Sequence, residues 1–126
     1  MAQKECIPLY TPGSRITAQT TAAVKAKTFV NISGAMAGGL PKVATSAAKA
    51  LKFGVAVRDA ANGARVLVIR GKGEVIPVVA GATFAAGDEL EVGANGKAVK
   101  FTDGVKVARA LDAATAADTD VFVELY

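Results

Sequence analysis

The sequence predicts an all-β fold: a small β-barrel or sandwich of short antiparallel strands, with an extended N-terminal arm and little helix. Short runs rich in β-branched residues alternate with glycine, asparagine and aspartate along most of the chain. Asn-Gly pairs, whose residues tolerate positive φ and therefore mark hairpin turns, occur at Asn62-Gly63 and Asn95-Gly96. Strands so short and closely spaced are typical of barrels and sandwiches rather than of alternating strands and helices.

The expected strands follow one another at short intervals. They are 15–20, 27–32, 51–57, 65–70, 75–79, 89–92, 98–101, 105–111 and 120–126. The run 65–70 is apolar between its charged ends, which indicates a strand covered on both faces. In the last strand, Val121, Val123 and Leu125 point to one face. Pro77 cannot donate a ladder hydrogen bond, so its strand is expected at a sheet edge or to bend there.

Three segments could form a turn or two of helix, namely 21–27, 45–52 and 82–86, but each is too short to be stable alone. Segments 55–69 and 108–125 share one plan, in which a strand, Asp-Ala-Ala, a turn of small residues and a second strand follow each other. This echo predicts a repeated hairpin within a compact barrel. We expect residues 1–14 to form the arm and residues 15–126 a single β-barrel domain.

The composition favours an assembly over a solitary monomer. Hydrophobic residues make up 52% of the 126 residues, although Trp is absent and aromatic residues contribute only 6%. So much apolar surface on a small domain is often covered by a partner. The longest uncharged stretches are broken by glycine and proline, so no membrane span is predicted. The first ten residues do not resemble a signal peptide, and the lone Cys6 suits a reducing compartment.

Charge is distributed unevenly along the chain, whose formal net charge is +4. Residues 1–58 hold eight Lys or Arg and one acidic residue, a net of +7. Residues 59–126 hold seven basic and ten acidic residues, a net of −3. Either the first half contacts a negatively charged partner, or the surface is simply solvated and uneven; the sequence leaves both open.

The sequence predicts no catalytic residue, no metal and no cofactor. Histidine is absent and cysteine occurs once, so an ordinary zinc site cannot be assembled. The glycines of Gly71-Lys72-Gly73 fit neither the Walker loop nor the dinucleotide fingerprint. Ser46 and Lys49 match the S-x-x-K of penicillin-binding enzymes, but the companion motifs are absent, and we attribute the match to chance.

A small basic β-barrel that binds nucleic acid is the alternative function. Such barrels place aromatic side chains where bases can stack on them. Phe29, Phe53 and Phe101 are present but are not clustered with basic residues in the sequence. This argues against nucleic acid as a partner without excluding it.

Four blocks of the sequence together resemble a known family. They are YTPGSRITAQTTAAVKAKTFVNI (10–32), FGVAVRDAANGARVLVIRGKGEVIPVVAG (53–81), ATFAAGDELEVGANGKAVK (82–100) and GVKVARALDAATAADTDVFVELY (104–126). Their order of turns, strands and glycines is similar to that of the small capsid decoration, or cement, proteins of tailed bacteriophages. The chain departs from the family pattern in the insertion-like segment 33–52 and at Asp118-Thr119.

The resemblance implies a non-enzymatic structural protein on the outer surface of a phage head, made in the cytoplasm of the host bacterium. Its partner would be the major capsid protein, whose neighbouring subunits it would bridge and stabilise. The resemblance also implies a homotrimer, with a dimer as the alternative.

The first residues have the character of an extended arm that could add to the sheet edge of another protein. Within it, Ile7, Leu9 and Tyr10 lie beside prolines and are the expected apolar anchors. Lys4 and Arg15 are expected to face an acidic capsid surface. These five residues form the predicted capsid-binding set.

Overall fold

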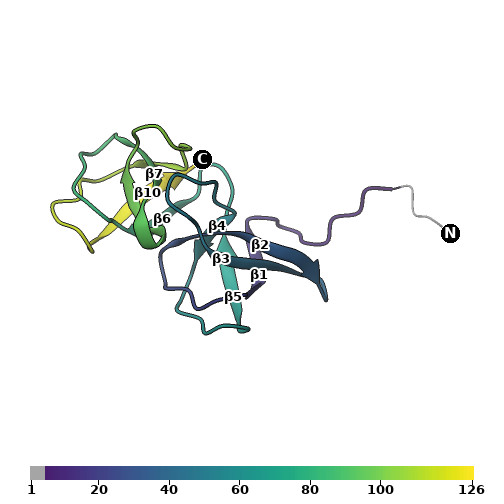
Figure 1. The fold of residues 1–126 in the computed structure, drawn as a ribbon. Coiled ribbons are helices and arrows are strands. Elements are labelled where there is room, and N and C mark those ends of the chain that lie inside the picture. Colours follow the sequence, from purple (N-terminus) through teal and green to yellow (C-terminus); the bar gives the residue numbers. More distant parts are fainter. Residues whose placement is uncertain (1–4) are drawn as a thin grey trace.

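The computed structural model describes residues 5–126 and consists almost entirely of short strands (Figure 1). The strands are β1 (Arg15–Thr20), β2 (Phe29–Ala37), β3 (Leu40–Thr45), β4 (Gly54–Ala56), β5 (Arg65–Ile69), β6 (Val75–Val79), β7 (Glu89–Val92), β8 (Ala98–Lys100), β9 (Ala108–Ala110) and β10 (Asp120–Leu125). The helical element of the described residues is one 3-10 turn, η1 (Ala94–Gly96). The predicted all-β fold with little helix is confirmed.

The strands form two sheets that follow each other along the chain. The first five close into a barrel with the order β1-β3-β2-β4-β5, in which β1 pairs antiparallel to β5 and parallel to β3. The last five form a sheet with the order β6-β10-β9-β7-β8. Figure 1 shows the barrel in the middle of the molecule and the second sheet at the end opposite to the N-terminus. The division into an arm and one domain stays a prediction.

The two sheets follow the same plan, so the sequence echo extends beyond a single hairpin. In the barrel, β2 pairs with β3 and β4, and β4 pairs with β5. In the second sheet, β7 pairs with β8 and β9, and β9 pairs with β10 in the same way. Isolated bridges also recur, since Val24 pairs with Ala60 in the barrel and Phe84 with Ala114 in the second sheet. Each half of the chain is therefore one copy of a five-strand unit.

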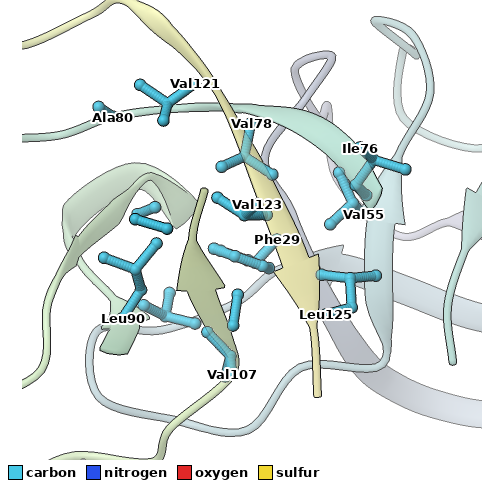
Figure 2. Packing of buried hydrophobic residues seen from close by; sticks show 14 of the residues in the cluster. Phe29, Val55, Ile76, Val78, Ala80, Leu90, Val107, Val121, Val123 and Leu125 are labelled. Carbon is cyan, nitrogen blue, oxygen red and sulfur yellow. The ribbon is translucent and has the colours of Figure 1, made fainter. Parts of the chain in front are cut away.

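The barrel and the second sheet share a wall whose strands are buried on both faces. Phe29 of β2 is fully buried in the core beside the second sheet, whereas its neighbour Val30 is fully buried inside the barrel. Val55 and Ala56 of β4 divide between the two cores in the same way. Figure 2 shows Phe29 and Val55 packed among side chains of the second sheet, such as Val123. The two halves are thus joined by apolar packing.

Several details of the predicted strands can be compared with this arrangement. The alternation of β10 is confirmed, because Val121, Val123 and Leu125 are all buried. Pro77 lies on β6, the first strand in the order of the second sheet, which confirms the predicted edge position. The prediction that 65–70 is covered on both faces is wrong at Leu67, which remains 37% exposed on the outside of the barrel.

Strand β3 was not among the expected strands, and none of the three possible helical segments is helical. β3 contains Pro41 and lacks a run of β-branched residues, so its pattern carries little strand signal. Its place is fixed instead by the Gly38-Gly39 turn, where both residues have positive φ, and by pairing with β2 on one side and β1 on the other.

The two Asn-Gly pairs behave differently. Asn95 and Gly96 both have positive φ, 61° and 72°, and join the antiparallel strands β7 and β8, so this predicted hairpin tip is confirmed. Asn62-Gly63 lies in the longer connection between β4 and β5, which also pair, but only Gly63 has a positive φ. This connection is longer because Ala60 first pairs with Val24 across the barrel.

The β7–β8 turn packs directly onto the barrel. A Cβ atom on Gly96 would lie 2.8 Å from the carbonyl oxygen of Phe29 and 2.8 Å from Cγ2 of Thr45. A side chain at this position would therefore strain the backbone and push apart the two halves at the shared wall.

We expect Gly96→Ala to destabilise the protein more than Gly63→Ala. Both glycines have positive φ, but a Cβ on Gly63 would have no atom within 4 Å. Gly63→Ala should therefore cost only the strain of the left-handed conformation, about 1–2 kcal/mol of unfolding free energy. Gly96→Ala should cost a further 1–3 kcal/mol or so through overpacking. Urea unfolding of the two variants measures the difference, and equal losses would contradict the tight contact.

A buried carboxylate fixes the loop that follows β8. Glu91 on β7 is 1% exposed, and its Oε1 accepts hydrogen bonds from the backbone N–H and, at 2.9 Å, from the hydroxyl of Thr102. The Thr102 N–H lowers the pKa of Glu91, opposed by burial and assisted by the Thr102 hydroxyl and the backbone of Gly104 and Asp103. The native state therefore favours the ionised carboxylate.

We expect Glu91→Gln to lower stability at neutral pH by about 1–3 kcal/mol, because the neutral amide oxygen accepts the Thr102 hydrogen bonds more weakly than the carboxylate does. The folded-state pKa lies below the ordinary value of 4.5, so this contribution is fully present above pH 4.5 and is lost as the pH falls through the folded pKa. The stability difference between the wild-type protein and the variant should shrink accordingly in urea unfolding series. Glu124→Gln, on the outer face of β10, is the control and should change stability by less than about 1 kcal/mol.

Candidate functional site

The described part of the N-terminal arm extends away from the body of the molecule (Figure 1). Residues 5–14 form no strand or helix. Ile7 and Leu9 are 63% and 64% exposed, so neither side chain contributes to a core of this chain. They stand two positions apart, which in an extended strand places both side chains on one face. Lys4 lies outside the described residues.

Tyr10 attaches the end of the arm to the barrel. Its hydroxyl lies 2.7 Å from the carbonyl oxygen of Gly39, in the β2–β3 turn, and 3.2 Å from that of Thr17 on β1. The phenol can donate to either oxygen, and the side chain is only partly exposed. Tyr10 therefore orients the arm within its own chain, and its predicted contact with a capsid protein stays a prediction.

The β2–β3 hairpin is the second exposed apolar element on this side of the molecule. Residues 33–39 are all exposed, as are the apolar side chains of Ile32 and Met36, at 50% and 53%. The β7–β8 hairpin is the equivalent element of the second copy. There the register pair Val92–Ala98 encloses residues 93–97, whereas the equivalent pair in the first copy, Ile32–Val43, encloses the longer segment 33–42. The segment 33–52, which departs from the family pattern, thus begins with a lengthened hairpin. We call the exposed residues of the arm and of hairpin 32–39 the arm–hairpin surface.

Arg15 does not present a free charge at the base of the arm. Its guanidinium forms an ion pair with Glu74, in the connection between the barrel and the second sheet. It also donates to the carbonyl oxygen of Ser14 at 3.3 Å. The structure therefore brings Tyr10 and Arg15 into contacts of the folded chain and leaves Ile7 and Leu9 available.

Ser46 and Lys49 are not arranged as a nucleophile and its base. Lys49 Nζ donates to Asp103, and this hydrogen bond raises the pKa of the lysine, which keeps the amine protonated. A lysine that acts as a base needs the opposite shift. Ser46 Oγ is buried without a hydrogen-bond partner in the described residues. Within residues 5–126, no three Cys, Asp or Glu side chains gather as a metal site.

The phenylalanines considered for base stacking are buried or are in contact with cations of the same chain. Phe29 is fully buried at the shared wall. The guanidinium of Arg70 lies 4.7 Å from the ring centre of Phe53, and Lys106 Nζ lies 5.1 Å from that of Phe101. These cation–π contacts stabilise the fold and leave no row of free aromatic faces among these three residues.

Lys52 helps to join the two halves. Its partly buried amine donates to the main-chain oxygen of Tyr126 at 2.9 Å. Burial lowers the pKa of Lys52, and the positive charge of Arg70 lowers it further.

In the described residues, no helix is long and apolar enough to cross a membrane.

Comparison with known families assigns the chain. The family model described as phage cement protein matches residues 10–125, nearly the whole length. The chain belongs to the phage cement protein family. It is therefore a structural, capsid-associated phage protein, as its resemblance to cement proteins predicted.

A solved structure shares the fold of this family member. The N base of the head fiber protein gp8.5 of bacteriophage phi29 superposes with a TM-score of 0.75 and 23% sequence identity. The alignment covers 89% of this chain and 92% of the phi29 chain. At this identity the likeness establishes the fold alone. A comparison with curated proteins finds no match.

Proposed function

We propose that this cement protein decorates the outer surface of a phage head and bridges neighbouring major capsid subunits through its arm–hairpin surface. The observation that carries the proposal is the exposure of apolar side chains on two elements that project from the barrel, away from the second sheet. Transfer of these exposed hydrophobic side chains from water into a protein contact is favourable, so their exposure indicates a binding surface. The protein is proposed to be non-enzymatic and to be made in the host cytoplasm before it reaches the virion.

The arm would contribute most of the apolar contact. Burying Ile7 and Leu9 could contribute about 3–6 kcal/mol before the cost of ordering the arm is subtracted. An extended segment can also pair its backbone with an exposed sheet edge. Pro8 has no backbone N–H to donate. In such a pairing, the nitrogen of residue 8 would therefore lie on the side of the arm that faces away from the partner strand.

The hairpin gives the protein a second contact region. Met36 and Ile32 lie on β2, and the Tyr10–Gly39 contact holds the hairpin turn against the end of the arm. Two projecting elements at one end of the molecule could contact two adjacent subunits at once. Such bivalent contact would stabilise a shell without any chemical step.

We expect deletion of residues 2–12 to leave a folded, soluble protein that no longer binds capsids. The reason is that the described residues of this segment, 5–12, contribute no strand to either sheet but carry Ile7 and Leu9. Co-sedimentation with undecorated capsids measures binding. The substitutions Ile7→Ser and Leu9→Ser, made together, should weaken binding by about tenfold or more while retaining the Tyr10 contact.

The matched control replaces Leu51 and Val105 by Ser, because both are exposed, at 61% and 36%, but belong neither to the arm–hairpin surface nor to the trimer face proposed below. This control should bind capsids as tightly as the wild-type protein. If the deletion variant decorates capsids as tightly as the full chain, the arm does not carry the contact and a face of the barrel must do so.

We further propose that the protein is a homotrimer, which hides part of the apolar surface of the second sheet. Phe122 on β10 is 56% exposed, lies opposite Pro77 on β6, and is accompanied by the exposed side chains of Val75 and Leu111. A closed cyclic assembly can cover such a face without leaving open ends.

Light scattering should accordingly give a mass of about three times the 12.7 kDa of one chain. Phe122→Ser should shift the protein towards monomers, because it removes the largest exposed apolar side chain of this face. A wild-type monomer at high protein concentration would contradict the trimer, and a mass of two chains would replace it by a dimer.

A further inference from the structure

The positive charge of the barrel is not spread evenly, because most basic side chains are paired within the chain. Among residues 5–126, eight Lys or Arg side chains lie within 4.0 Å of a carboxylate. They are Arg15, Lys25, Lys27, Lys49, Lys97, Lys100, Lys106 and Arg109. The net charge of residues 1–58 is therefore larger than the positive charge that remains unpaired and available to a partner. The basic residues without such a pair show where the charge remains.

Three of these residues lie together on the outside of the barrel. Lys42 on β3 and Arg65 on β5 are the register partners of Gln19 on β1, one on each side. Arg58, just beyond β4, reaches across to donate to the carbonyl oxygen of Arg65 at 3.0 Å. Neighbouring strands thus place these cations in one line across the sheet. We call Lys42, Arg58 and Arg65 the basic row.

Two side chains of this row, Lys42 and Arg58, are held by uncharged partners. Lys42 Nζ donates to Oε1 of Gln19, whose amide in turn donates to the carbonyl oxygen of Gly63 at 3.0 Å. Arg58 is held by a main-chain oxygen in the same way. Partners of this kind orient a cation without neutralising it, so less side-chain entropy is lost when an anionic group binds.

The basic row is continuous with the arm–hairpin surface. Lys42 lies at the base of the hairpin, where it pairs with Gly34 of β2. Thr17, two residues before Gln19, is the residue whose carbonyl oxygen Tyr10 contacts. Register places Thr17 opposite Leu67, an exposed apolar side chain on the same face.

We propose that the basic row binds an acidic surface of the capsid shell protein, as an extension of the arm–hairpin contact. This inference rests on the proposed decoration function and specifies the chemistry of the partner. Exposed apolar side chains, Leu67 and Val57, lie beside the row and fit a folded protein surface, whereas a phosphate backbone offers them no apolar contact. The basic row on the barrel face would make the charged contact with the capsid shell protein, and the arm would make the apolar contact.

The test compares two full-length triple variants that lose the same charge. The first carries Lys42→Gln, Arg58→Gln and Arg65→Gln. The control carries Lys25→Gln, Lys72→Gln and Lys100→Gln, in which Lys25 and Lys100 form only long pairs of 3.9 Å and Lys72 has no carboxylate within 4.0 Å among the described residues. Binding to undecorated capsids is measured by co-sedimentation at several salt concentrations, and circular dichroism verifies that both variants fold.

The row variant should bind capsids about tenfold more weakly at low salt, with a shallower dependence on salt than the wild-type protein. The control should change affinity by less than about threefold. A further variant with Arg58→Lys and Arg65→Lys retains the charges and should keep most of the affinity.

Equal affinity of the row variant and the control would overturn the inference while leaving the decoration function intact. Salt-dependent binding of duplex DNA by the wild-type protein, lost in the row variant alone, would also overturn it, because the row would then be a nucleic-acid site. If the wild-type protein does not bind capsids at any salt concentration, the decoration function and the inference both fail.

Discussion

The structure depends on one shared wall, formed where β2 and β4 are buried on both faces. Successive residues of β2 serve opposite cores, since Phe29 packs with the second sheet and Val30 fills the barrel. Such a wall cannot alternate apolar and polar residues, because neither face meets water. At this wall Phe29, Val30, Val55 and Ala56 are therefore all apolar, and small side chains such as Ala56 leave room for the two cores to share one layer. Separating the halves would expose Phe29 and its neighbours.

The same wall explains why two copies of one strand plan have different hairpins. The β7–β8 turn faces the barrel, and Gly96 lies against the backbone of Phe29, so that turn has no space to lengthen. The β2–β3 turn points away from the second sheet, and neither Gly38 nor Gly39 would place a Cβ within 4 Å of another atom. Extra residues could therefore be accommodated only in the first copy. The repeat supplies a rigid support, and its outward-facing hairpin is where a binding element can be added.

Local patterns in the sequence were sufficient to predict much of this fold. Alternation identified β10, and two residues that tolerate positive φ identified the β7–β8 turn. β3 was missed because Pro41 and the lack of a β-branched run leave it with little strand signal, so that its position depends on pairing with β2 and β1. Leu67 was misjudged because an apolar residue does not reveal whether its face is covered. The site is similar: the exposure of Ile7 and Leu9 agrees with an extended arm. The Tyr10–Gly39 contact and the Arg15–Glu74 ion pair join distant segments that no local pattern connects.

Long-range pairing also changes how the charge of the chain should be understood. Lys27 and Arg15 of the first half are paired with Asp120 and Glu74 of the second, so opposite net charges of the two halves partly serve to hold them together. Among the described residues, Lys42, Arg58 and Arg65 on the barrel have no carboxylate within 4.0 Å, so their charge remains available. A partner would therefore meet a short line of positive charges beside the exposed apolar side chains of the arm and the hairpin. The charges would set the orientation and rate of approach, while burial of the apolar groups would determine how long the contact lasts.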